Sequence, residues 1–536
     1  MLKHKTDGSI GRLLLVALLA VCSPALAGPL PQDNLVMHFD AGAGVFVDNK
    51  VTPVADGQTV NYWLDQAARG GVQEAQMATA ASRPLYVASA IGGLPALRFD
   101  GANDNILVLD NVDGGLLDAN PNLTWFSVFR PNVATAQMSV MRSRYTGTGG
   151  NANLWGTFLE STQNMSHARN SGGTMVRSTS TAKAQPTLIA AAWDGSAGTV
   201  AQWTHGVANA AAAGANNPAT TFDRMRIGAH MDSNGYAAGT YFNGDIAEIL
   251  VYDAVLPAAD RRQVETYLVD KYMAAASPQV LAHWNFNDRS PGSGSFDGMR
   301  LADSSGNGRD AFAGGGANPP TFVAGGPYEG TRSALHLTST RDCAIFRDGF
   351  AFGDGGPPAG SDINFGADDS FTLETYFRTS MTSGTGGLVS KDVAPNQPSW
   401  WLRVQDGALR FLVADGQSHE PNIHATGFPV ADGQWHHVAA VRDADLDLLR
   451  LYLDYELIGT ILDTTTAGLS NNNDIRIGEF NNAGSQFLGD IDYVRISSGA
   501  LTSSQFIQPG VPEPATLLLL GCGLAGLAGR LRRRVR

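Results

Sequence analysis

The chain has 536 residues, and 37 lysines and arginines against 50 aspartates and glutamates give it a net charge of −13 at pH 7. A surface this negative repels phosphate backbones and anionic lipids, which argues against nucleic acid as a partner. Of the three cysteines, Cys22 and Cys522 lie near the two ends. Cys343 is therefore alone in the body of the chain, which excludes an intramolecular disulfide and a cysteine zinc site there.

The first 27 residues have the pattern of a secretory signal peptide. Basic residues, including Lys3 and Arg12, precede the apolar segment 13–21, which is too short to span a membrane. Residues 25–27, Ala-Leu-Ala, then provide a small-x-small cleavage site. We therefore expect export. Cys22 leaves lipidation as an alternative, although the residue before it is larger than a lipoprotein signal requires.

Between its two ends the chain repeats one order of landmarks. Short alternating segments, bounded by turns rich in Gly, Asn and Asp, predict antiparallel sheets packed face to face. We expect strands over 35–40, 95–101, 123–130 and 242–249 in the first half, and over 280–286, 333–337, 371–378 and 487–494 in the second. The sequence thus predicts an all-β fold with two tandem β-sandwiches, over residues 33–273 and 280–508, joined by a linker at 274–279.

The first half ends in a helix that the second half lacks. Residues 256–272 have a helical pattern, and Pro257 suits the first turn. The apolar stripe expected to pack on the sandwich comprises Val264, Tyr267, Leu268 and Tyr272. In the second half, residues 501–506 form only a stub of the same helix.

The second half contains the sharpest strand pattern. One strand is expected over 433–442, the next over 448–454, and a returning strand over 455–459. This passage resembles the laminin-G-like domains of the concanavalin A-like lectin/glucanase superfamily. The resemblance covers residues 280–498, and residues 34–273 more loosely. It implies a jelly-roll β-sandwich in each half.

The hairpin in this passage departs from the family pattern. The family turns on Asp-Gly, because Gly supplies the positive φ that a two-residue turn needs. This chain has Asp454 and Tyr455 instead. Either Tyr455 is strained or the loop is longer.

The sequence carries no recognisable catalytic site. Glycoside hydrolases of this fold place Glu-x-Asp-x-Glu on one strand face, and no such string occurs. Asp245 and Glu248 are three residues apart, so strand alternation predicts opposite faces. Asp490 and Asp492 share a face by the same rule but form only half of the motif. We therefore expect no enzyme activity, with no catalytic residue assigned.

Two adjacent histidines, His436 and His437, suggest a metal or catalytic pair at first sight. Adjacent strand residues face opposite sides of a sheet, so the two rings cannot bind one ion. We expect both to be structural.

Calcium is the one cofactor that the sequence supports. The loop 303–308 offers hard oxygen ligands on a glycine-bent turn. Many relatives carry one calcium between such a loop and the closing strand, and the resemblance implies these ligands: Asp303 and Asn307 with Asp490 or Asp492, and Asp65 with Asp245 in the first domain. The alternative is an Asn/Asp turn that binds its own backbone without metal.

Sugar binding needs exposed aromatic rings beside polar groups. The candidate platforms are Trp155, Tyr236, Trp400 and Trp401, with Tyr145 and Trp203 as further loop-region aromatics. Because Trp400 and Trp401 are adjacent, we expect one ring in the core and the other outside it. Cys343 is expected to be buried, since an apolar strand follows it.

The C-terminal residues 509–536 form the most specific motif of the chain. The residues Val511, Pro512, Glu513 and Pro514 precede an apolar run over 515–529 and an arginine-rich tail. This pattern resembles the PEP-CTERM sorting signal of Gram-negative bacteria. The resemblance implies a short transmembrane helix, recognition and cleavage by an exosortase, and a final place at the cell surface or outside it. The alternative is an ordinary tail anchor.

These features together predict an exported surface or matrix protein that binds extracellular polysaccharide, or another surface partner, through non-catalytic jelly-roll domains. Two alternatives remain: a glycan-degrading hydrolase with an unrecognised site, and a structural matrix component that binds proteins. The ligand and the oligomeric state do not follow from the sequence.

Overall fold

The computed structural model describes residues 29–509 except 68–73, 110–121, 134–136, 146–154, 161–162, 170–174, 182–183, 214–221, 231–239, 296–297, 315–318, 327–332, 339–342, 347–362, 393–395 and 481–484. The predicted signal peptide, the sorting motif, its apolar run and Tyr236 lie outside these residues, as do the side chains of Tyr145 and Cys343. Within the described part of the chain, no helix is long and apolar enough to cross a membrane.

The first sandwich consists of two antiparallel sheets. In the described ranges, its outer sheet has the order β15 (Val207–Ala208), β14 (Thr199–Thr204), β13 (Thr187–Asp194), β8 (Asn122–Pro131), β18 (Asn243–Tyr252), β6 (Leu94–Asp100), β5 (Leu85–Ile91), with β1 (Leu35–Asp40) paired to β18 and β16 (Ala212–Ala213) to β14. The facing sheet has the order β12 (Met175–Thr181), β11 (Gln163–Arg169), β10 (Trp155–Glu160), β9 (Met138–Tyr145), β17 (Phe222–Ile227), β7 (Ile106–Leu109), β4 (Glu74–Gln76), β3 (Tyr62–Leu64), β2 (Val45–Phe46). A short 3₁₀-helix, η1 (Ala80–Ser82), precedes β5.

The second sandwich has the same construction. Its outer sheet has the order β32 (Glu456–Leu462), β31 (Leu448–Leu453), β30 (Trp435–Asp443), β25 (Phe371–Thr379), β34 (Gly489–Ser498), β23 (Ser333–Leu337), β22 (Thr321–Ala324), with β19 (Val280–Trp284) paired to β34. The facing sheet has the order β29 (Asn422–Pro429), β28 (Ala408–Asp415), β27 (Pro398–Gln405), β26 (Thr385–Lys391), β33 (Ile475–Ile477), β24 (Cys343–Phe346), β21 (Ala311–Gly314), β20 (Arg300–Leu301).

The two sandwiches therefore follow one topology. The central pair β8 and β18 of the first corresponds to β25 and β34 of the second, and each first strand pairs with the closing strand. One apolar core fills the space between the sheets of each sandwich. The predicted all-β class with two packed β-sandwiches is confirmed. The expected strands 35–40 and 333–337 match β1 and β23 residue for residue.

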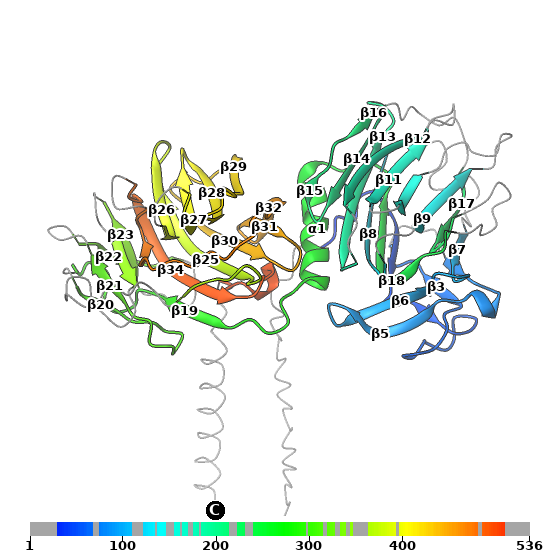
Figure 1. Ribbon diagram of the computed structural model, residues 1–536, viewed down its shortest axis with the longest axis horizontal. Helices are drawn as coiled ribbons and strands as arrows, with labels where there is room; N and C mark the ends of the chain where they lie inside the picture. The colour runs from blue at the N-terminus through cyan, green and yellow to red at the C-terminus, as the bar shows by residue number, and fades with distance from the viewer. Residues whose placement is uncertain are drawn as a thin grey trace, which may run out of the picture.

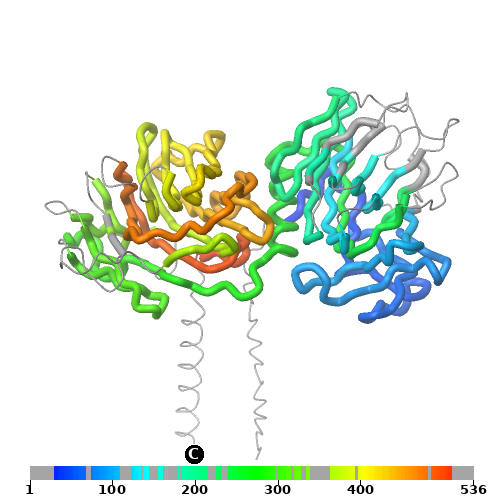
Figure 2. The backbone as a smooth tube through the Cα atoms, viewed as in Figure 1, coloured from blue at the N-terminus to red at the C-terminus, as the bar shows by residue number. Residues whose placement is uncertain are grey.

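Helix α1 (Ala258–Tyr272) lies between the two sandwiches (Figure 1). Pro257 is the N-cap residue of this helix. Its buried residues Val264, Leu268 and Tyr272 cover the outer sheet of the first sandwich, as the stripe predicted. Figure 2 shows the chain leaving this helix and running directly into the second sandwich. The stub in the second half is the 3₁₀-helix η2 (Ser503–Gln505).

The helix also contacts the second sandwich. Asp270 accepts hydrogen bonds from the backbone N–H of Ser503 at 2.8 Å and from its hydroxyl at 2.5 Å. The hydroxyl oxygen of Thr266 accepts a hydrogen bond from the backbone N–H of Leu457 on β32 at 3.3 Å. Helix α1 is thus part of the interface between the domains.

The hairpin between β31 and β32 turns on two residues, so the shorter of the two expected geometries is present. Asp454 and Tyr455 have φ values of 49° and 71°, which is the left-handed region that disfavours a residue with a Cβ. The Tyr455 ring stacks on His437 with centroids 4.4 Å apart, and its hydroxyl donates to the carbonyl of Ile507 at 2.9 Å. These contacts offset the strain.

Candidate functional site

A β-bulge changes the predicted faces of the closing strand β18. Its pairing with β8 shifts register between Ile246 and Glu248. Ile246 and Ile249 both point into the core, so Glu248 lies on the outer face together with Asp245. The prediction of opposite faces was wrong, because the extra residue Ala247 inverts the alternation. Strand β34 has the matching shift, where it pairs with β25.

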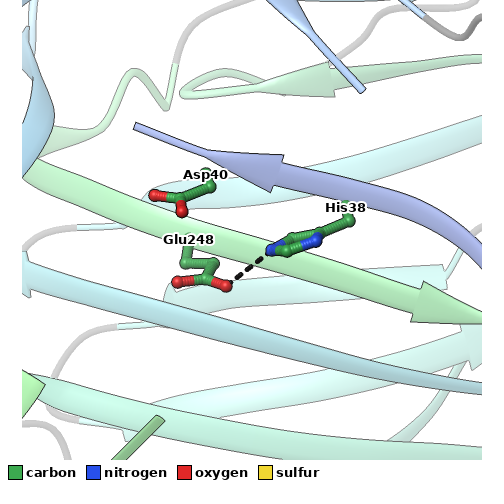
Figure 3. Close-up of side chains that lie close together, drawn as sticks. All are labelled: His38, Asp40 and Glu248. Atoms are coloured by element: carbon green, nitrogen blue, oxygen red, sulfur yellow. Dashed lines mark hydrogen bonds and ion pairs between the residues drawn. The ribbon is translucent and has the colours of Figure 1, made fainter. Parts of the chain in front are cut away.

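The bulge places Glu248 in a cluster of polar side chains beneath helix α1. Glu248 has no exposed surface, and its Oε1 lies 2.7 Å from Nε2 of His38 on β1 (Figure 3). Its Oε2 accepts from Nζ of Lys271 at 2.7 Å and from the hydroxyl of Tyr272 at 2.8 Å. The same ammonium group lies 2.7 Å from Oδ2 of Asp40. The cluster thus joins the first strand, the closing strand and the helix.

The pKa shifts in this cluster indicate that Glu248 and Lys271 keep their charges. Burial alone would raise the pKa of Glu248, but the hydrogen bond with His38 and the charge of Lys271 hold that pKa below its usual value. Burial would lower the pKa of Lys271, but Glu248 and Asp40 raise it. Ligand atoms of His38, Asp40 and Glu248 lie within 4.8 Å of one another, as in a metal centre. The Lys271 ammonium group already binds both carboxylates, so it supplies the positive charge that a metal ion would bring.

The second sandwich has a different charged cluster on the corresponding face. Glu374 on β25 is fully buried, and its Oε2 accepts from Nε of Arg495 at 2.6 Å. Its Oε1 accepts from the backbone N–H of Ile507 at 3.0 Å and lies 3.4 Å from Nε2 of His437. Burial alone would raise the pKa of Glu374, and the charge of Arg495 outweighs it, so the carboxylate is ionised. Neither cluster followed from the sequence, although an acid within an apolar strand was a usable signal.

Asp245 and Asp490, both predicted calcium ligands, have basic side chains as partners. Asp245 accepts from Nε of Arg98 at 2.7 Å and from an Nη atom of Arg130 at 2.6 Å. The second sandwich repeats this arrangement with three residues at the corresponding positions: Asp490, Arg378 and His336. In both domains the carboxylate ties the closing strand to its two neighbours.

The predicted calcium loop is a turn that binds its own backbone. Asp303 accepts from the N–H groups of His283, Ser305 and Arg309 at 2.9–3.0 Å, and from the Ser305 hydroxyl at 2.8 Å. These hydrogen bonds keep the pKa of Asp303 low, although burial opposes them. The side-chain amide of Asn307 donates to the carbonyl of Val280 at 2.8 Å. The contacts have the geometry of the metal-free alternative, and calcium binding stays a prediction.

The remaining calcium candidates also have protein partners. Asp492 accepts from the N–H of Gly326 at 2.9 Å. Asp65 accepts from the N–H groups of His38 and Ala67 at 2.7 and 2.9 Å. Burial raises the pKa of Asp65 to about 6, although these hydrogen bonds oppose it.

The predicted sugar platforms are covered. Trp155 is 3% exposed and Trp400 has no exposed surface, because both rings belong to the sandwich cores. Trp401 lies outside the core, as expected for the neighbour of Trp400. It is nevertheless only 5% exposed, because Phe480 and the guanidinium group of Arg403 pack against its ring. These three assignments are corrected, since a ring packed in this way has no free face for a sugar.

Trp203, a further aromatic candidate for sugar binding, packs against helix α1. Its ring is half-buried beneath the guanidinium group of Arg261, whose Cζ lies 4.1 Å from the ring centroid.

The adjacent histidines His436 and His437 lie in different surroundings. His436 lies between Asp432 and Asp454, whereas His437 is buried beside Glu374. The two histidines therefore have separate partners, as their opposite faces predicted.

Comparisons with known proteins agree with this geometry. Residues 354–506 match the family model of the concanavalin A-like lectin/glucanases superfamily. Residues 510–534 match the PEP-CTERM protein-sorting motif. This motif implies processing by an exosortase, export, and sorting to the cell envelope of a Gram-negative bacterium. No curated protein matches the chain.

Parts of the chain are similar to several solved structures. The binding domain of Paraclostridial Mosquitocidal Protein 1 is 18% identical over 42% of this chain and 50% of its own, with a TM-score of 0.32. This chain thus spans about half of that relative. Domain 4 of the GH43 arabinanase AbnA of Geobacillus stearothermophilus, in complex with arabinotriose, is 18% identical over 42% and 96%, with a TM-score of 0.31. Domains LG4-5 of the mouse laminin alpha1 chain are 14% identical over 80% and 96%, with a TM-score of 0.24.

Proposed function

We propose that this chain, which carries a concanavalin A-like domain and a PEP-CTERM sorting motif, is an envelope or matrix protein that binds carbohydrate without hydrolysing it. The observation that carries the proposal is the match of residues 354–506 to a superfamily of lectins and glucanases. Lectins bind sugars and glucanases hydrolyse them, and the buried charges described above favour binding without hydrolysis.

Hydrolysis of a glycosidic bond needs two carboxyl groups beside the substrate, one of them a proton donor. The buried carboxylates of the outer sheets do not meet this requirement. Glu248, Asp245 and Glu374 have no exposed surface, and each is paired with a cationic side chain. These carboxylates are held by basic side chains and are out of reach of a sugar. They support a structural role for these acids and a non-catalytic role for the domains.

The route to the surface follows from the sorting motif. The apolar run 515–529 is shorter than the roughly 20 residues that span a bilayer, which suits a temporary anchor. We propose that the chain is held at the membrane by this run and is cleaved near Pro512, Glu513 and Pro514. Replacing these three residues with alanine should leave the full-length chain in the membrane fraction, whereas the native chain should appear shortened at the surface.

The binding proposal is tested with the full-length chain in detergent on an array of bacterial and plant polysaccharides. We expect retention on at least one polysaccharide and no release of reducing ends during prolonged incubation. Release of reducing ends would establish the hydrolase alternative. Retention of envelope proteins, without retention on any polysaccharide, would establish the protein-binding alternative.

A further inference from the structure

A cavity of about 240 Å³ lies where the two domains meet, beside strands β14 and β15 at the edge of the outer sheet of the first sandwich. Residues of both domains line it. The first contributes Ser180, Thr204 and Asn209, and the second contributes Leu446, Leu448 and Leu462. Liquid water takes up about 30 Å³ per molecule, so this volume holds roughly eight waters or one small organic ring.

The wall from the first domain is polar, with hydroxyl and amide groups that both donate and accept hydrogen bonds. The Thr204 hydroxyl donates to Ser180 Oγ at 2.6 Å and lies 3.1 Å from Asn209 Oδ1. Behind this wall, the buried Nε2 of Gln202 lies 3.2 Å from both Ser180 Oγ and Asn209 Oδ1. Gln202 thus supports the positions of the polar side chains that line the cavity.

The wall from the second domain is aliphatic. Leu448 is buried, and Leu462 on the paired strand β32 is 56% exposed. An exposed leucine beside a polar wall is suited to a ligand that presents C–H groups on one side and hydroxyl groups on the other. A sugar ring has this character, and its hydroxyl groups can exchange hydrogen bonds with Ser180, Thr204 and Asn209.

The side chains that line the cavity restrict the charge of the sugar that it would bind. Among the described residues that line the cavity there is no Asp, Glu, Lys or Arg. A uronic acid or sulfated sugar would therefore bury its charge without a counter-ion, which is costly. The net charge of −13 opposes such a ligand further.

The cavity also has room to continue. A second cavity of about 520 Å³ shares Gln185 and Leu446 with the first and extends along the linker from Ala274 to Pro278. The two cavities therefore adjoin at these residues, and Asp443 and Asp445 line the second. A linear chain of several sugar units suits two adjoining cavities better than a single free monosaccharide does.

We infer that these adjoining cavities bind a segment of a neutral polysaccharide, with one sugar ring in the first cavity between the side chains of Ser180, Thr204 and Asn209 and the side chain of Leu462. The inference rests on the proposed function and gives it a site and a ligand class. It requires both domains, since each supplies one wall of the site.

The test uses the full-length chain in detergent and affinity electrophoresis in gels that contain neutral glucans, galactans, mannans or xylans, or anionic polygalacturonate. Leu462→Ser removes the aliphatic side chain opposite the polar wall, and Thr204→Val replaces a hydroxyl of that wall with a methyl group of similar size. Leu488→Ser is the matched control, because Leu488 is 44% exposed and does not line the cavity. Melting curves check that each variant is folded.

We expect the chain to bind a neutral polysaccharide, Leu462→Ser and Thr204→Val each to weaken binding about tenfold or more, and Leu488→Ser to leave it unchanged. Equal binding by parent and Leu462→Ser would overturn the interdomain site while the proposed function stands. Binding of polygalacturonate alone would overturn the neutral ligand class. Binding of no polysaccharide at all would remove the proposed function itself.

Discussion

The ammonium nitrogen of Lys271 lies 2.7 Å from Oε2 of Glu248, so an ion pair joins helix α1 to the closing strand of the first sandwich. Glu248 has no exposed surface, and the Lys271 side chain is 20% exposed. The pair therefore interacts in a medium of low polarity, where removal of one partner costs far more than at a surface.

Lys271→Met should destabilise the first domain strongly. The methionine fills the volume of the lysine stem but leaves Glu248 and Asp40 without their shared cation. Loss of one partner of a buried ion pair costs about 3–5 kcal/mol. Urea unfolding followed by tryptophan fluorescence measures the change.

Lys50→Met is the control for this variant. Lys50 forms an ion pair with Glu74, but its side chain is 41% exposed, so the loss should be within about 1 kcal/mol. Similar losses for the two variants would contradict the role assigned to Lys271.

Asp65 should make the first domain more stable in mild acid. Burial raises its pKa from 3.8 to about 6. Between these pH values the folded chain keeps a proton that the unfolded chain has released, so the free energy of unfolding falls as the pH rises through this window. Asp65→Asn should remove this part of the pH dependence. The measurement is the difference in melting temperature between parent and variant from pH 4 to 7. This difference should change with pH across the window, and a constant difference would contradict the titration of Asp65.

Ala67→Ser should stabilise the first domain at pH 7. In the second domain Ser305 occupies the equivalent position, and its hydroxyl donates to Oδ2 of Asp303 at 2.8 Å. Oδ2 of Asp65 has no hydrogen-bond partner in the described ranges. The new hydroxyl should supply one and add about 1 kcal/mol. No gain at pH 7 would mean that the two loops are not equivalent.

Asp270→Ala should weaken the contact between the domains. The buried N–H and hydroxyl groups of Ser503 would lose their acceptor, at a cost of about 1–3 kcal/mol. Differential scanning calorimetry should then separate the transitions of the two domains. Glu456→Ala is the control, since its ion pair with Arg262 at the same interface is exposed and worth less than about 1 kcal/mol. An unchanged calorimetric profile of Asp270→Ala would contradict coupling through Ser503.

Tyr455→Gly should destabilise the second domain despite relieving the positive φ. The relief is about 1–2 kcal/mol. Loss of the partly buried ring and its hydrogen bond should cost about 3 kcal/mol, at the lower end of the range for buried aromatic side chains. Chemical denaturation should therefore show a net loss, and a net gain would mean that the turn, and not the ring, governs this hairpin.

Chelation should leave the melting temperature unchanged, because Asp303 and Asp490 already have protein partners. The measurement is a melting curve of the full-length chain with and without excess EDTA. A fall in the melting temperature that calcium restores would support the calcium site that the resemblance implies.

The strands were predictable because their side chains alternate on the pleated surface. In the runs 35–40 and 333–337, alternate side chains such as Phe39, Leu335 and Leu337 face the cores, which fixes the register of the strands. Helix α1 was equally clear, since Val264, Leu268 and Tyr272 recur at helical spacing.

The clusters were not predictable, because they depend on contacts between distant segments. Glu248 meets His38 across 210 positions, and the bulge at Ala247 turns it to the face where Lys271 lies. Composition also does not separate a core tryptophan from an exposed one. Trp155 and Trp400 were therefore assigned to a sugar site when both fill the cores.

Ile507 and Gln508 are 6% and 7% exposed, and Ile507 is bonded to both Glu374 and Tyr455. The folded body therefore continues almost to the sorting motif. Even a fully stretched chain gains only about 3.6 Å per residue, so Pro512 can be no more than roughly 14 Å from Gln508. A protease that cuts at this motif must therefore bind the chain within roughly 14 Å of the folded second domain.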